Sequence, residues 1–105
     1  MAIVYQNVTG STGVDVELLA PGSNARIKSI MVTNIHATAD ATVSLFIQDS
    51  PTAAAAQTFY IIHKVAIPAK ASLLLDDKEL LGIDGNTFGL YTTVGSSDTI
   101  DVLIN

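Results

Sequence analysis

The strongest constraint on the fold is a pair of strand-like runs at residues 29–49, which read SIMVTNIHATADATVSLFIQD and flank a small polar hinge at residues 34–40. In the second run every other residue is apolar, namely Val43, Leu45 and Ile47. The residues that alternate with them carry mostly hydroxyl and amide groups: Thr42, Ser44, Phe46 and Gln48. A period of two is that of a β-strand, whose successive side chains point to opposite faces of a sheet. The segment therefore predicts two strands joined as a hairpin through the hinge.

Similar runs recur along the chain, and short turn signals separate them. Pro21-Gly22 and Asp84-Gly85 are dipeptides typical of tight turns. The alanines at 53–56 are too few for a stable helix, so a loop or a single turn is expected there. We expect strands over these ranges: 2–8, 14–18, 27–35, 42–48, 57–67, 71–76, 87–94 and 99–104.

The spacing of these runs is typical of a β-sandwich or barrel. At 105 residues the chain is long enough for one hydrophobic core and too short for two. The sequence thus predicts an all-β protein: a single β-sandwich domain, jelly-roll or Ig-like, of about eight short antiparallel strands over residues 1–105. Residues 87–94 and 99–104 are expected to pair as a second hairpin.

Composition predicts a weakly charged, hydroxyl-rich surface. Charged residues make up 14% of the chain, against about 25% in an ordinary globular domain, and serine and threonine fill the difference. Lysine and arginine supply much of the charge that keeps proteins apart in solution, so a surface with five such residues tolerates close packing against copies of itself. A threonine-rich sheet protein without such a role is the alternative that composition leaves open.

Charge and missing residue types disfavour several function classes. The net charge of −5 and the isoelectric point near 4.5 argue against a nucleic-acid partner, which needs a basic surface. The sequence has no cysteine, so disulfides and thiol catalysis are not expected. The absence of cysteine is compatible with folding in a reducing cytoplasm. It begins MAIVYQNV without a basic region ahead of an apolar one, and it has no run of eighteen apolar residues. We therefore expect neither a secretory signal nor a membrane-spanning segment.

Acidic and amide side chains concentrate in one stretch: Asp76, Asp77, Glu79, Asp84 and Asn86. Their oxygens are the ligands that Ca²⁺ prefers, but the spacing does not follow the EF-hand loop. Acids at a strand end followed by a turn are typically solvated, so we expect no metal and no cofactor. Cation binding by the stretch from Asp76 to Asp84 stays open as an alternative.

The two histidines are the residues most suited to acid–base chemistry. His36 lies in the hinge and His63 lies within an expected strand, and neither has a companion motif. An active site would require one of them to converge with Asp40 or Asp84 in a pocket. No G-x-S-x-G sequence surrounds any serine, so we expect no catalytic residues and no enzyme activity.

The three tyrosines and three phenylalanines suggest carbohydrate binding as a second class of function, because a flat ring exposed on a sheet can stack on a sugar. Phe46, Phe59 and Phe88 lie in strongly apolar strands and are expected in the core. The tyrosines are the surface candidates. A carbohydrate-binding or host-adhesion module that uses Tyr60 and Tyr91 to bind a glycan is therefore the alternative function.

Both ends of the chain are apolar, nearly uncharged and free of proline, at residues 2–5 and 100–104. Strands of this kind pair readily with another strand when their edges are exposed. We expect them to be covered, either in the middle of a sheet or by a neighbouring subunit, which predicts a homo-oligomer. The candidate interface residues are Ile3, Val4, Tyr5 and Tyr91.

Three segments carry a resemblance to a known family: SIMVTNIHATADATVSLFIQD, FYIIHKVAIPAKASLLLDD and NTFGLYTTVGSSDTIDVLIN. They combine a strand ending in Thr-Asn, a polar hinge, an Ile-Pro-Ala turn before a leucine strand, and a closing Asp-Val strand. Over residues 27–105 the chain resembles the small β-sandwich virion structural proteins of tailed bacteriophages, particularly the cyanophage type. The resemblance implies a capsid decoration, neck or tail component that contacts other virion proteins. It also implies assembly in the host cytoplasm and a final location in the virion.

Overall fold

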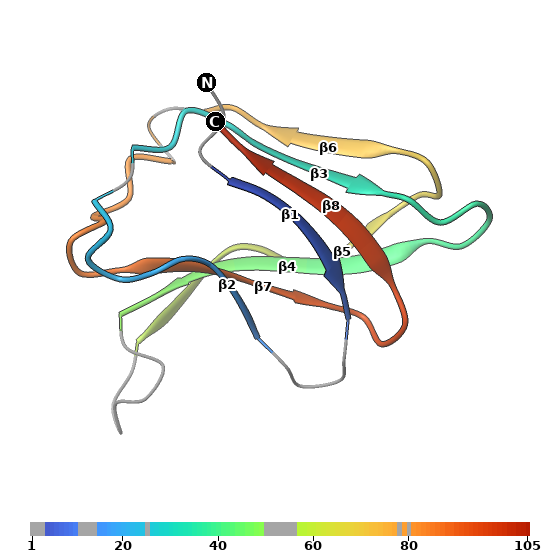
Figure 1. Ribbon diagram of the computed structural model, residues 1–105, viewed down its shortest axis with the longest axis horizontal. Helices are drawn as coiled ribbons and strands as arrows, with labels where there is room; N and C mark the ends of the chain where they lie inside the picture. Colours follow the sequence, from blue (N-terminus) through green and yellow to red (C-terminus); the bar gives the residue numbers. More distant parts are fainter. Residues whose placement is uncertain (1–3, 11–14, 25, 50–56, 78, 80) are drawn as a thin grey trace.

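The computed structural model describes residues 4–10, 15–24, 26–49, 57–77, 79 and 81–105. Within these residues the protein is all-β and contains no helix, and its eight strands form two antiparallel sheets of four strands each (Figure 1). The expected all-β class and strand number are confirmed. The strands are β1 (Val4–Thr9), β2 (Val16–Leu19), β3 (Ile30–Asn34), β4 (Ala41–Gln48), β5 (Thr58–Ile67), β6 (Ser72–Leu75), β7 (Gly89–Val94) and β8 (Thr99–Ile104).

The strands pair in a nested order. Sheet A has the order β1-β8-β3-β6, and sheet B has the order β2-β7-β4-β5. The chain therefore pairs from its middle outwards: β4 with β5, β3 with β6, β2 with β7 and β1 with β8. Further pairing of β3 with β8 and of β4 with β7 joins these pairs into the two sheets, which lie one above the other in Figure 1.

Both expected hairpins are wrong, although the expected strands are present. β3 and β4 lie in different sheets, and so do β7 and β8, so the connections at residues 35–40 and 95–98 cross between the layers. The turn chemistry does reverse the chain, because the amide of Asp98 donates to the carbonyl oxygen of Gly95 at 2.9 Å. A reversal does not select the partner strand, and β8 gains two partners, β1 and β3, by crossing to sheet A.

The hydrophobic core lies between the sheets and is supplied mainly by the central strands β3, β8, β4 and β7. Alternate side chains of these strands are fully or almost fully buried: Ile30, Val32, Val43, Leu45, Leu90, Val94, Ile100, Val102 and Ile104. Full burial of one such side chain stabilises the fold by about 1.5–3 kcal/mol before conformational entropy is subtracted. The apolar parity expected for β4 is confirmed, since Val43 and Leu45 are buried and Ile47 packs against the core.

The two end strands of the chain lie side by side in sheet A. β8 is a central strand, so its apolar residues 100–104 are covered within the sheet, which is one of the two expected arrangements. β1 is an edge strand, and no described strand pairs with its free edge. Within the described residues, the outer edge of β1 therefore has no partner strand.

Candidate functional site

Four apolar side chains form a row across the whole outer face of sheet A. The strand registers place Tyr5 of β1 opposite Leu103 of β8, and Leu103 opposite Met31 of β3. Met31 in turn lies opposite Leu74 of β6. Tyr5 is 71% exposed and Leu74 is 56% exposed, while Leu103 and Met31 are half-buried. We call these four residues the apolar row; they lie on the face of sheet A that points away from the core.

A polar row runs beside the apolar row in the same strand order, and consists of Asn7, Asp101, Thr33 and Ser72. The side-chain amide of Asn7 donates to Asp101 Oδ1 at 2.7 Å. The hydroxyl oxygens of Thr33 and Ser72 share a hydrogen bond of 2.8 Å. These groups satisfy one another and flank the apolar row with polar atoms, as the rim of a protein interface does.

The free edge of β1 lies at one end of the apolar row and lacks the features that normally protect sheet edges. Native proteins blunt an edge with short strands, charged residues, proline or a bulge. Of the other edge strands, β2 and β6 have four residues each, and β5 carries Lys64 and a bulge. β1 has six residues, VYQNVT, with no charge, no proline and an unbroken register against β8. It is therefore the edge best suited to pair with another chain.

The four candidate interface residues occupy different environments. Tyr5 belongs to the apolar row. Val4 points to the opposite face of β1 and packs against the core, and Ile3 lies outside the described residues. The expectation that Tyr91 is a surface side chain is wrong, because its exposed fraction is 3%.

Tyr91 is buried on the outer face of sheet B by its neighbours in the same cross-strand row. Its ring stacks on Phe46 of β4 at 5.8 Å between centroids, and its hydroxyl donates to Glu17 Oε2 of β2 at 3.3 Å. Burial, and then the nearby negative charge of Glu17, raise the pKa of the Tyr91 hydroxyl. Tyr91 therefore holds β2 against β7 and is not open to a glycan.

The phenylalanines follow the sequence expectation only in part. Phe46 is 3% exposed, but it lies on the outer face of sheet B, where the rings of Tyr91 and Tyr60 cover it. Phe59 is 53% exposed and contacts the edge of Phe88 at 5.9 Å, so its expected core position is wrong. The cause is its place near the start of the edge strand β5, where one side of the strand has no neighbour. Of the two tyrosines in the alternative function, only Tyr60 is open, at 53% exposure.

A bulge in β5 changes the direction of two polar side chains. Val43 pairs with Val65 and Leu45 pairs with Ile62, so His63 and Lys64 together face the single residue Ser44. Lys64 has a φ of 51°, and its amide donates to Ser44 Oγ at 2.8 Å. Bulges of this kind redirect side chains and occur often beside functional sites.

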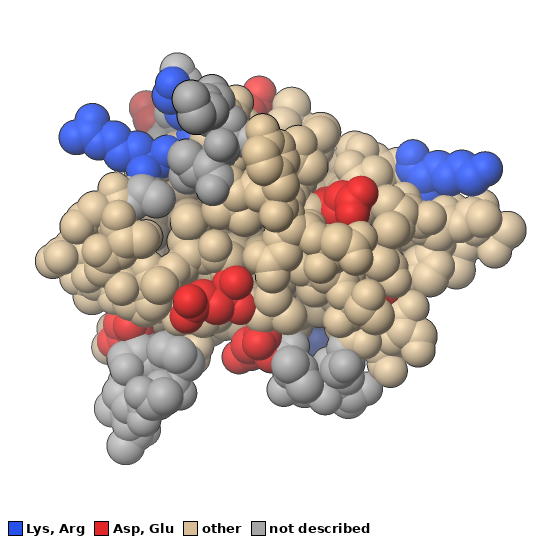
Figure 2. Space-filling model, viewed as in Figure 1, with Lys and Arg blue, Asp and Glu red and all other residues tan. Residues whose placement is uncertain are grey.

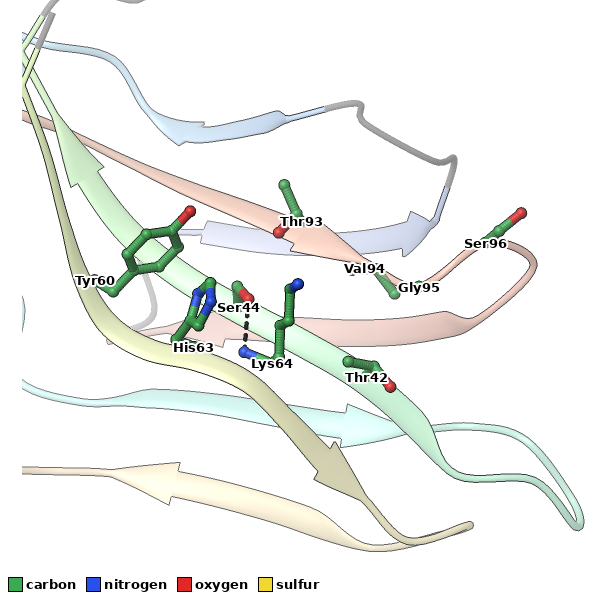
Figure 3. Close-up of a pocket in the computed structure, with 9 residues that line it drawn as sticks. All are labelled: Thr42, Ser44, Tyr60, His63, Lys64, Thr93, Val94, Gly95 and Ser96. Carbon is green, nitrogen blue, oxygen red and sulfur yellow. Dashed lines mark hydrogen bonds between the residues drawn. The ribbon is translucent and has the colours of Figure 1, made fainter.

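The bulge borders an open groove of about 250 Å³ on the outer face of sheet B (Figure 3). Tyr60, His63 and Lys64 line it from β5, and Figure 3 shows the Lys64 side chain extending over β4 towards β7. The remaining polar lining is formed by four hydroxyl side chains: Thr42, Ser44, Thr93 and Ser96. We call this site the bulge groove.

Neither histidine meets the carboxylates considered from the sequence. His36 Nε2 lies 3.5 Å from Asp98 Oδ1, and the other oxygen of Asp98 accepts a hydrogen bond from the amide of Thr42 at 3.1 Å. Asp98 thus ties the β3–β4 connection to the β7–β8 turn. His63 instead packs edge-on against the ring of Tyr60, with 4.2 Å between centroids. The contact of His36 with Asp98 depends on the crossing of two distant connections, which no local sequence pattern reveals.

The acidic stretch uses its oxygens to shape turns. Asp77 Oδ1 accepts the amide of Glu79 at 3.0 Å, and Asp84 Oδ1 accepts the amide of Asn86 at 3.1 Å. The Thr87 hydroxyl, and then the backbone amide of Asn86, hold the pKa of the Asp84 carboxyl below its usual value. Within the described part of the chain, no three His, Asp or Glu side chains are placed to hold one metal ion.

Comparisons with known proteins add no assignment for these surfaces. No protein-family model matches the chain, and neither a curated protein nor a solved structure matches it. In the part of the chain that the structure describes, no helix has the length and apolar character needed to cross a membrane.

Proposed function

We propose that this protein is a non-catalytic structural component of a phage virion: a capsid decoration, neck or tail protein that self-associates and docks onto other virion proteins. The observation that carries the proposal is the apolar row beside the unprotected edge of β1. A free sheet edge bonds to another strand through its backbone groups, and the apolar row adds buried apolar area next to that contact. Both features favour a protein that acts by contact with other proteins.

The first partner we propose is a second copy of this chain. Two β1 strands that pair antiparallel across a two-fold axis extend sheet A, and the same surface is then used on both subunits. Such pairing brings the Tyr5 ends of the two apolar rows close to each other. Since β1 carries no charged side chain, no like-charge repulsion within the paired strands opposes this contact.

The nested strand order supports a jelly roll as the type of sandwich. In an Ig-like sandwich the first two strands are neighbours in one sheet, whereas β1 and β2 here lie in different sheets. A jelly roll has eight strands in two sheets and is the fold of many viral capsid domains and lectins. A fold alone does not define a function, so the strand order supports a virion role only together with the surface.

The distribution of charge supports a closely packed location. In Figure 2 most of the visible surface belongs to neither acidic nor basic residues, and the acidic side chains on this face are scattered. The centre of a protein interface is typically depleted of charged residues. A surface of this kind suits a subunit that is surrounded by other protein.

Self-association is tested by Tyr5→Glu. We expect the wild-type protein to be an oligomer at micromolar concentration, and we expect Tyr5→Glu to raise its dissociation constant about 100-fold, or by about 2.8 kcal/mol. The reason is that the new carboxylate must lose water in an otherwise apolar contact. Size-exclusion chromatography with light scattering measures the change.

Phe59→Glu is the matched control for Tyr5→Glu. It places the same charge at another exposed aromatic residue, 53% exposed and in sheet B, and should leave the oligomer intact. A wild-type protein that is a monomer at these concentrations, or equal weakening by both variants, would contradict association through the β1 edge.

The virion role is tested by locating the protein in particles. We expect it in purified phage particles, with antibody label at regular positions on the capsid, neck or tail in electron micrographs. Treatment of particles with a non-specific protease before labelling distinguishes an external decoration from a buried component. If no particle contains the protein, the virion proposal is wrong, whatever the result with Tyr5→Glu.

A further inference from the structure

The bulge groove combines a positive charge with a set of hydroxyl groups, in a protein of net charge −5. Among the described residues, no aspartate or glutamate lines the groove. The structure records no ion pair between Lys64 and a carboxylate of any described residue. The ammonium group is therefore available to an anionic ligand, and four hydroxyl side chains beside it can donate or accept hydrogen bonds.

Lys64 occupies a backbone conformation that favours glycine. Its φ of 51° is left-handed, which costs a side chain with a Cβ about 1 kcal/mol or more. The other described non-glycine residues with positive φ are Asn24, Lys70 and Ser97, which lie in connections between strands, whereas Lys64 lies inside β5. Glycine at position 64 would relieve the strain and would also remove the amine. A strained lysine that lines a groove is therefore a candidate for ligand contact.

The neighbouring aromatic ring is held in a fixed position. Tyr60 packs against Phe46 at 5.4 Å and against the edge of His63 at 4.2 Å between centroids, yet it remains 53% exposed. A fixed and exposed ring offers a flat apolar surface at little cost in side-chain entropy. The C–H face of a pyranose ring is a suitable partner for such a surface.

We propose that the bulge groove binds a single carboxylated pyranose unit of a glycan. The carboxylate pairs with Lys64, the apolar face of the ring lies on Tyr60, and the sugar hydroxyls bond to the groove hydroxyls around Ser44. A groove of about 250 Å³ is smaller than the roughly 300–1,000 Å³ of a pocket for a drug-sized ligand, which suits one sugar ring. The site lies on sheet B and does not depend on the apolar row of sheet A.

The test is a nuclear magnetic resonance titration of the full chain with glucuronic acid and, separately, with N-acetylneuraminic acid. The two arms distinguish a uronic acid from a sialic acid as the source of the carboxylate. We expect one of them to shift the amide signals of Ser44, Lys64 and Thr93, with half-saturation on the order of 1 mM. Glucose, which has no carboxylate, should bind at least about tenfold more weakly.

Lys64→Gly separates ligand binding from stability. It should weaken binding of the acidic sugar about tenfold or more, while the free energy of unfolding stays equal or rises because glycine accepts the left-handed backbone. Lys70→Gly is the matched control: Lys70 has a φ of 63°, lies in the β5–β6 turn and does not line the groove. Tyr60→Ala should weaken binding by about tenfold as well.

Three results would overturn the proposal. One is that neither acidic sugar shifts the groove amides at concentrations up to tens of millimolar. Another is binding by Lys64→Gly that equals binding by Lys70→Gly. The third is binding of glucose as strong as that of the acidic sugars, which would remove the role of the carboxylate.

Discussion

Replacement of Asn34 by alanine should lower the free energy of unfolding by about 3 kcal/mol. Asn34 is fully buried at the end of β3. Its side-chain amide donates to the carbonyl oxygens of Ala39 at 2.8 Å and Ile67 at 2.9 Å, and its Oδ1 accepts the amide of His36 at 2.9 Å. Alanine leaves these three backbone groups without their partner, and each unsatisfied buried group costs about 1–3 kcal/mol.

The size of this effect follows from what Asn34 connects. It fixes the start of the β3–β4 connection through His36 and its end through Ala39. It also joins sheet A to the last residue of β5 in sheet B through Ile67. One side chain thus holds the crossing between the layers, and its loss should destabilise the fold cooperatively. Urea denaturation followed by circular dichroism measures the change.

Thr33→Ala and Asn34→Asp make the test specific. Thr33→Ala removes one exposed hydrogen bond, to Ser72, from the same strand and should cost less than about 1 kcal/mol. Asn34→Asp keeps the shape but replaces two amide donations by a carboxylate facing two carbonyl oxygens, so it should cost at least as much as Asn34→Ala. Tolerance of aspartate, or equal effects of Thr33→Ala and Asn34→Ala, would show that the hydrogen bonds of Asn34 do not stabilise the crossing.

The strands were predictable from the sequence because alternation is a local property. Their pairing was not predictable, since it joins residues that are far apart in the chain. The hinge at residues 34–40 follows from its polar composition. The reason for its shape is the bond from Asn34 to Ile67, 33 residues away. In the same way, β3 takes β8 and β6 as neighbours rather than β4, the next strand in the chain.

Which face of an end strand is buried also depends on distant residues. Val4 and Tyr5 are both apolar, so alternation places them on opposite faces but does not say which face meets the core. The register of β1 against β8 decides it, with Val4 beside the buried Ile104 and Tyr5 beside Leu103 on the outer face. The apolar row could not be recognised before four strands were aligned.

The bulge is visible in the sequence as a break in the period of two. Ile62 and Val65 both lie opposite core residues of β4, although they are three positions apart. The polar pair His63-Lys64 between them marks the extra residue that makes this spacing fit one face. A search for such breaks in alternation would have placed the bulge at residues 63–64, but not Tyr60 and the hydroxyl groups that complete the groove.

Substitution of Gly89 by alanine should lower the free energy of unfolding by about 2–3 kcal/mol, through crowding and not through lost contacts. Gly89 begins β7 and is buried beside the end of β2, its neighbour in sheet B. A Cβ at this position would lie 2.5 Å from the carbonyl oxygen of Leu19 and 2.7 Å from Cδ of Pro21. These are backbone and ring atoms that cannot rotate away, so β2 or its connection to β3 must move.

Gly22→Ala is the comparison that isolates crowding from backbone strain. Gly22 has a φ of 88°, but the nearest atom to an added Cβ is 3.9 Å away, so this variant should cost only the conformational penalty of about 1 kcal/mol. Gly89→Ala should also speed hydrogen exchange in β2 more than in β8, because the displaced segment holds β2 against β7. Equal destabilisation by the two variants, or unchanged exchange in β2, would mean that the close approach of Leu19 and Pro21 does not fix the edge of sheet B.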